Sequence, residues 1–233
     1  MKKTISTLLA LLFVAAVFTN CEKDKEDNTP LLVLLLAADQ LGGNCATITR
    51  QSTTSYSATI TVVPKGACKV NQTKAEAVTS AETSKTTILG FYTRAGASCD
   101  ATKTTVTTLL DNDINTTKNK TDAAYAEDVA KLRALSVGSL IVETTAKLKN
   151  DGRTDAQIAA MSLGTIDDLG LYSAAEYARI LTQTACQNAV KALNQASADA
   201  IFSNPPTKLV TSSCTYGSSA AAGTKCATLN LEF

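Results

Sequence analysis

Alternating apolar and polar residues predict β-structure in two parts of the chain. The alternation is clearest in Ala58, Ile60 and Val62, and it extends over 46–63. Polar residues from Gln51 to Ser55 interrupt it, so we expect a hairpin. A second stretch of strand-like sequence lies within 208–233, and we expect it to pair with this hairpin. These β elements would form one small antiparallel sheet.

Helical spacing of apolar residues dominates between these stretches. The pattern predicts helices over 73–92, over 121–148, and from 173 to the Pro205-Pro206 pair, which ends the last one. Two capping boxes mark helix starts, and they consist of Thr154 with Gln157 and Ser173 with Glu176. We therefore expect a mainly α fold with a small antiparallel β-sheet, of the α+β class.

A further helix is predicted over 31–41, where Thr29 is placed as the N-cap and Pro30 as the first helical residue. Its residues from Leu31 to Ala38 are all apolar, so no side of two helical turns is polar. Such a helix must be covered. It can be a central core helix, or it can lie in a lipid interface.

The first residues of the chain have the composition of a secretory signal. Lys2 and Lys3 precede an apolar run from Ile5 to Phe18, and no acidic residue occurs before Glu22. This run is short for a membrane span, which needs about 20 residues. We therefore interpret residues 1–20 as a signal peptide rather than a transmembrane helix.

The end of this run, Val17 to Cys21, resembles the signal of bacterial lipoproteins. In that class the peptidase cuts directly before a cysteine that carries diacylglycerol, and the new N-terminus is then acylated. Phe18 and Asn20 stand where the common motif has leucine and glycine or alanine. Such a relaxed motif is similar to that of spirochaetal lipoproteins. The resemblance implies lipidation at Cys21.

A mixed-charge run, Glu22 to Asn28, follows the predicted lipidation site. It should stay solvated, and it predicts a tether over 21–29. No internal repeat or long linker follows. We therefore expect 30–233 to form a single domain.

The charge balance argues against nucleic acid as a partner. The chain has 22 lysines and arginines against 21 aspartates and glutamates, and no basic block. It also has no histidine and no tryptophan. Without histidine, the usual general base and the usual zinc ligand are missing. No nucleophile or phosphate-binding motif appears either, so we expect neither an enzyme nor a cofactor.

The seven cysteines are consistent with export. Assigning Cys21 to lipid leaves an even number, and these are too widely spaced for zinc sites, which use close pairs. An exported protein uses such cysteines in disulfides, and six of them allow 15 pairings. We favour a pairing in which the first and last bridges close hairpin-like units, namely Cys45 with Cys68, Cys99 with Cys186, and Cys214 with Cys226.

One stretch has the spacing of a calcium loop. Its oxygen-bearing residues fit positions 1, 3, 5 and 12, and they are Asp111, Asp113, Asn115 and Asp122. However, the sixth position holds Thr116 where the sharp turn needs glycine. The alternative, which we prefer, is a solvated loop between helices.

Together these features predict a lipid-anchored protein of the cell envelope, held at the outer membrane through its N-terminal lipid. It would act by contact, either as a structural component or by binding a protein or another ligand at the cell surface. The alternative is a carrier of a small apolar ligand, with a helical cavity lined by Leu31 to Ala38.

Overall fold

The predicted hairpin forms the centre of a four-stranded sheet in this computed structural model, which describes residues 43–70 and 73–230. Its strands are β1 (Asn44–Arg50) and β2 (Tyr56–Pro64), and they pair antiparallel. Ile48 and Ile60 are fully buried, which is the period-two pattern expected for a sheet with one covered face. The hairpin prediction is confirmed.

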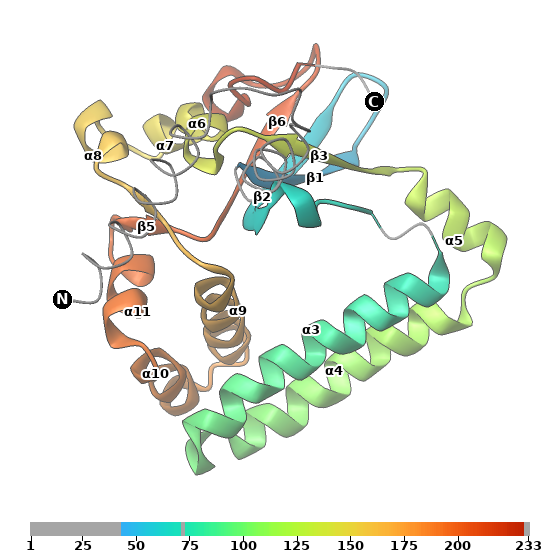
Figure 1. The fold of residues 1–233 in the computed structure, drawn as a ribbon, viewed down its shortest axis with the longest axis vertical. Coiled ribbons are helices and arrows are strands. Elements are labelled where there is room, and N and C mark those ends of the chain that lie inside the picture. Colours follow the sequence, from blue (N-terminus) through green and yellow to red (C-terminus); the bar gives the residue numbers. More distant parts are fainter. Residues whose placement is uncertain (1–42, 71–72, 231–233) are drawn as a thin grey trace, which may run out of the picture. The chain divides into compact units, whose positions relative to one another are not determined.

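Two segments far away in the sequence complete the sheet. β3 (Leu132–Val137) pairs with β1, and β6 (Thr211–Tyr216) pairs with β2, so the order is β3-β1-β2-β6 (Figure 1). All these pairs are antiparallel. The expected pairing of the late strand with the hairpin is therefore confirmed for β6.

The predicted helix over 121–148 is wrong. This segment contains β3 between α5 (Asp122–Val129) and two short helices, α6 (Leu140–Glu143) and α7 (Thr145–Asn150). The outer edge of β1 would otherwise leave a row of backbone groups without partners. Pairing with that edge outweighs the local helical pattern, because backbone hydrogen bonds in a folded sheet must be satisfied.

The end of the chain does not continue the sheet as predicted. After β6, the chain forms the 3₁₀ turn η3 (Ala222–Thr224) and an isolated bridge between Lys225 and Thr215. Residues 227–230 are not a strand, and the predicted residues 231–233 lie outside the described part of the chain.

The longest helices form a hairpin, α3 (Lys74–Ala95) and α4 (Asp100–Asn119), which lie side by side in Figure 1. Both are rich in threonine, a weak helix former. Many of these threonines donate their hydroxyl to the carbonyl four residues earlier, as Thr83 does to Thr79 O at 2.9 Å. Packing of one face of each helix, through residues such as Tyr92 and Val106, stabilises them.

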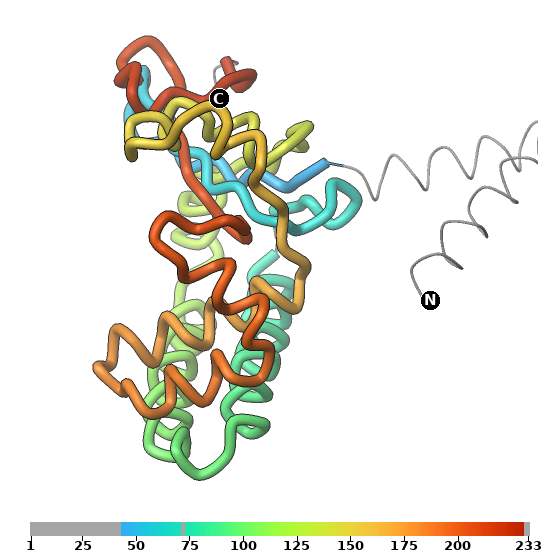
Figure 2. Tube along the Cα trace, turned by 90° about the vertical axis from the view of Figure 1, so that its left-hand side faces the viewer, coloured from blue at the N-terminus to red at the C-terminus, as the bar shows by residue number. Residues whose placement is uncertain are grey.

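Of the later helices, α9 and α10 pack beside this hairpin (Figure 2), and α11 packs against those two. Close approach of α9 to α3 depends on Gly170, where an added Cβ would lie 2.6 Å from the ring of Phe91. In chain order this part of the molecule consists of α8 (Asp155–Ala159), β4 (Ser162–Leu163), α9 (Ile166–Ile180), α10 (Thr184–Ala192), α11 (Gln195–Phe202) and β5 (Lys208–Leu209). The single helix predicted from 173 to Pro205-Pro206 is wrong, because the chain turns at Thr182, with φ of 57°, and again before α11, so three helices form. Only the end before the two prolines agrees with the prediction.

One predicted capping box is present and the other is not. Thr154 and Gln157 cap α8 as expected. Ser173, in contrast, lies inside α9 and donates to Leu169 O at 2.8 Å. The box that starts α9 consists of Thr165 and Asp168, so the N-cap lies eight residues earlier in the sequence than predicted.

The favoured cysteine pairing is confirmed. Disulfides join Cys45 to Cys68, Cys99 to Cys186, and Cys214 to Cys226. The second ties the start of α4 to α10 inside the helical core, and the third holds the segment after η3 against β6. The fold is thus α+β, mainly helical, with a small antiparallel sheet and disulfide staples.

The described residues all belong to one compact unit, Gly42–Phe233. The predicted helix over 31–41 lies outside them. Among the residues that the structure covers, no helix is both long and apolar enough to cross a membrane.

Removing the two buried disulfides separately should destabilise the protein to different degrees. Cys99 and Cys186 close a loop of 87 residues, and Cys214 and Cys226 close one of 12. In the chain-entropy model these loops correspond to about 4.6 and about 2.8 kcal/mol. We therefore expect the Cys99→Ala, Cys186→Ala variant to melt about 4 to 7 °C below the Cys214→Ala, Cys226→Ala variant.

Each variant removes two sulfurs that are almost fully buried, so the loss of packing is similar in both. Scanning calorimetry of the two variants measures the difference. Equal melting temperatures would mean that loop length does not govern the contribution of these bridges.

Candidate functional site

A cleft beside β6 has a volume of about 580 Å³. We call it the β6 cleft. It lies where β6, α7 and the segment before β5 meet, and its lining includes Lys147, Arg153, Tyr172, Pro206, Thr211 and Ser213. Its size is within the range of pockets that hold small molecules or a few peptide residues.

Two cations and one carboxylate line the β6 cleft, so the net charge of its lining is positive. Lys147 lies 2.6 Å from Asp151, four residues later on the same helical turn. Arg153 has no acidic partner among the described residues; its Nη1 donates to the backbone carbonyl of Pro206 at 2.7 Å. Its remaining N–H groups can bind a carboxylate or another anion in a planar, two-pronged arrangement.

Tyr172 contributes an aromatic wall to the cleft. Its ring stacks on Phe202 with 5.7 Å between the ring centroids. Burial, together with the nearby Glu176 carboxylate, raises the pKa of the Tyr172 phenol. The hydroxyl therefore stays protonated near neutral pH and can both donate and accept a hydrogen bond.

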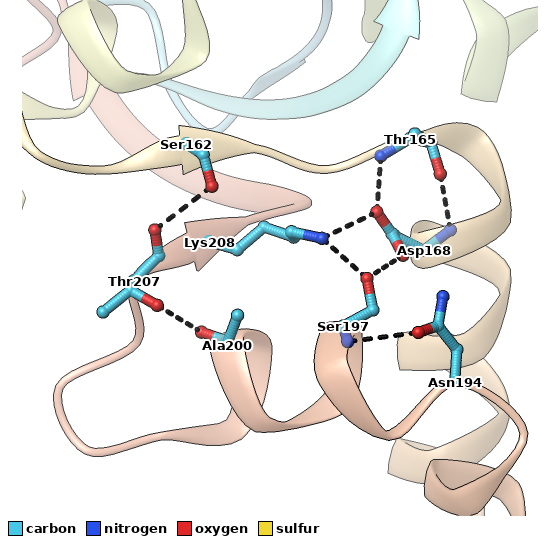
Figure 3. Close-up of polar contacts among 8 residues, drawn as sticks. All are labelled: Ser162, Thr165, Asp168, Asn194, Ser197, Ala200, Thr207 and Lys208. Atoms are coloured by element: carbon cyan, nitrogen blue, oxygen red, sulfur yellow. Dashed lines mark hydrogen bonds and ion pairs between the residues drawn. The ribbon is translucent and has the colours of Figure 1, made fainter. Parts of the chain in front are cut away.

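A second polar cluster joins α9, α11 and β5 (Figure 3). Asp168 accepts hydrogen bonds from the backbone N–H of Thr165, at 2.9 Å, and from the hydroxyl of Ser197. The ammonium of Lys208 lies 2.7 Å from the Ser197 oxygen and 3.4 Å from Asp168. Three segments that are well separated in the sequence therefore meet at one carboxylate.

This cluster resembles a serine beside a lysine base, but its hydrogen bonds do not suit nucleophilic chemistry. A nucleophilic serine needs a neighbour that accepts its proton and an open path to the substrate. The Ser197 hydroxyl donates its proton to the Asp168 carboxylate and accepts from Lys208, so Lys208 is a hydrogen-bond donor to the serine and not its base. Ser197 is also only 4% exposed. These hydrogen bonds therefore have a structural role: they join α9, α11 and β5 at a buried carboxylate.

The pKa of the Asp168 carboxyl reflects opposing effects. Burial raises it, but the hydrogen bonds from Ser197 and Thr165 and the charge of Lys208 favour the ionised form and together lower the pKa. Asp168 is therefore ionised near neutral pH, and its charged form stabilises the folded state relative to the unfolded one.

Glu143 is a second buried carboxylate, and it binds the segment around Thr228. It is 1% exposed, and its oxygens accept from the hydroxyl of Thr228 and, at 3.0 Å, from the backbone N–H of Thr228. Cys214 and Cys226 lie close to it, a grouping that could suit a metal ion. Because both sulfurs are bonded to each other, neither offers a thiolate ligand.

The calcium-like residues do not form a loop, and neither the calcium site nor the predicted solvated loop is present. Asp111, Asp113 and Asn115 lie within α4, because burial of Ile114 continues the helix through this stretch. Asp111 pairs with Lys85 on the neighbouring helix. Asp122 begins α5 and lies 2.9 Å from Lys74. An EF-hand type site needs a non-helical loop that converges on one point.

No pattern in the sequence predicted the β6 cleft or the cluster around Asp168. Cys21 lies outside the described residues, and the other six cysteines are all in disulfides. The only local signal for the Asp168 cluster was Thr165 three residues before an acid at a helix start.

No family model, curated protein or solved structure matches this chain. Its function has therefore to be inferred from its own residues and contacts.

Replacing Asp168 with alanine should destabilise the protein by about 2 to 4 kcal/mol. The change removes a helix cap, at about 1 kcal/mol, and leaves the buried Ser197 hydroxyl without its acceptor, at about 1 to 3 kcal/mol. The neighbouring Asp167 lies in the same helical turn but is exposed. Asp167→Ala is the matched control, and urea unfolding should show a much smaller loss. Similar losses of unfolding free energy in both variants would contradict the structural role of the Asp168 hydrogen bonds.

The lowered pKa of Asp168 also predicts a dependence on pH. Its contribution to stability is present above the unfolded pKa of about 3.9 and is lost as the pH falls through the lower folded value. Below pH of about 4, the free energy of unfolding should therefore fall more steeply in the wild type than in Asp168→Asn. Urea titrations at a series of pH values measure the two slopes, and parallel slopes would disprove the assignment.

Proposed function

We propose that this chain is a lipid-anchored binding protein of the cell envelope. Lipid on Cys21 holds it at the membrane, and the disulfide-bonded unit faces the aqueous side and binds another molecule by contact. The observation that carries the proposal is the complete pairing of the other six cysteines.

The disulfides support export in two ways. Bridges of this kind persist in oxidising compartments outside the cytosol. The chain has seven cysteines, so pairing six leaves Cys21 without a cysteine to pair with. This is the cysteine that ends the signal-like segment. Lipid modification would explain why the chain carries this one cysteine without a disulfide partner.

An anchor of several acyl chains would hold the protein firmly. Each buried methylene contributes about 0.8 kcal/mol, so a diacylglycerol group with a further acyl chain makes release negligible. We place the anchor at the outer membrane, with the short charged tether keeping the folded unit close to the surface.

The β6 cleft supports a polar or anionic ligand for this binding protein. Arg153, Lys147 and several hydroxyl groups line it, and this chemistry suits a carboxylate better than an apolar molecule. The alternative role as a carrier of an apolar ligand depends on the segment from Leu31 to Ala38, which lies outside the described residues.

Replacing Cys21 with serine should move the protein from the detergent phase to the aqueous phase in detergent phase partitioning. Serine has nearly the same size but cannot receive the thioether-linked lipid. Asn20→Gly is the matched control, because it keeps the cysteine and brings the neighbouring residue closer to the common lipoprotein motif. A Cys21→Ser protein that still enters the detergent phase would falsify the anchor.

A further inference from the structure

The pairing of β6 with β2 determines which of its backbone groups point outward. The N–H of Val62 donates to Val210 O at 3.0 Å. In the same register Ile60 faces Ser212 and Ala58 faces Cys214. Antiparallel strands alternate between hydrogen-bonded and non-bonded pairs. The even-numbered residues of β6 therefore bond to β2, and the odd-numbered ones point their N–H and C=O groups away from the sheet.

Other parts of the chain cover this outer edge on both sides of a short gap. Before the gap, Leu209 O accepts from the N–H of Gly164 at 2.8 Å. After it, Thr215 O accepts from the N–H of Cys226 at 2.8 Å. Between them, the backbone groups of Thr211 and Ser213 have no partner from the outer side among the described residues. Ser213 is exposed, and both residues line the β6 cleft.

We propose that this gap binds a short extended segment of a partner protein as an additional β-strand, and that Arg153 binds a carboxylate of that segment. Strand addition at an open sheet edge is a common mode of peptide recognition, in which backbone hydrogen bonds supply affinity and side-chain contacts supply specificity. At a rise of about 3.3 Å per residue, the gap accommodates about three to five residues.

The charges of the cleft indicate an acidic segment. The Lys147 charge is offset by Asp151, whereas Arg153 lies in the same cleft with no acidic partner in the part of the chain that the structure describes. The acid can be a side chain or a terminal carboxylate, since both present the same two oxygens. Edge pairing with a second copy of this chain would bring together two such arginines, and like charges oppose it.

This inference deepens the proposed binding role and rests on it, but the two are tested separately. The experiment uses the chain from residue 21 onward with Cys21→Ser, so it needs no lipid. Failure of the anchor leaves peptide binding unaffected, and failure of peptide binding leaves the anchor in place.

The probe is a library of random octapeptides displayed on phage and selected on this protein. Selected peptides are then synthesised, and their affinities are measured for two variants at one position. Ser213→Pro removes the outward N–H, and proline is tolerated at such an edge position. Ser213→Ala keeps the N–H and is the matched control. We expect at least tenfold weaker binding to the proline variant and less than twofold change for the alanine variant.

The charge contact has its own test. Arg153→Gln should weaken binding of acidic peptides at least fivefold, and the same peptides with asparagine for aspartate should bind both proteins equally. Arg133→Gln, on the opposite edge strand β3, is the control and should change nothing. Amidated and free-acid forms of each peptide distinguish a terminal carboxylate from an acidic side chain.

Several outcomes would overturn the proposal. The first is that the selection enriches no peptides. The second is that Ser213→Pro binds the selected peptides as tightly as Ser213→Ala does. The third is that the enriched peptides contain no acidic group. A concentration-dependent dimer that Ser213→Pro abolishes would assign the edge to a second copy instead. If Ser213→Pro does not fold, as judged by its melting curve, peptides methylated at alternate backbone nitrogens are compared on the unmodified protein. Methylation at the positions facing the edge should then abolish binding.

Discussion

The backbone hydrogen bonds of the β1–β2 hairpin constrain the rest of the molecule. A two-stranded hairpin is marginally stable alone, and each of its outer edges carries N–H and C=O groups that need partners. β3 supplies them on one side and β6 on the other. Two later segments of the chain must therefore pair with the hairpin, and the helices lie in the long segments between β2 and β3 and between β3 and β6. The bridge from Cys99 to Cys186 joins one helical segment to the other in the helical core.

The order of apolar and polar residues was enough to predict those elements that are determined by a few neighbouring residues. The alternation around Ile60 marks β2, and Thr154 with Gln157 marks the start of α8. The cysteine pairing followed from the same local view, since two of its bridges close hairpin-like units. Fold class also followed, because the helical and strand patterns occupy separate parts of the chain.

Features that depend on distant contacts were missed. The apolar residues from Leu132 onward fit a helical period, and only the presence of β1 makes this segment a strand. Asp168 at the third position of a helix is a weaker capping signal than the glutamate of the usual box. Its role depends on Ser197 and Lys208, which no spacing rule connects to it. The β6 cleft likewise combines Arg153 with Ser213, and no sequence motif joins them.

The bridge between Cys214 and Cys226 has a consequence for the protein before it is oxidised. It holds the segment around Lys225 along β6, and that segment covers the edge at Thr215. In the reduced chain nothing covalent keeps this cover in place, so the open edge can lengthen from Thr211 to the end of the strand. A long open edge is a template for aggregation. The bridge thus shortens the exposed edge of β6, within the described residues, to the stretch that lines the cleft with Arg153.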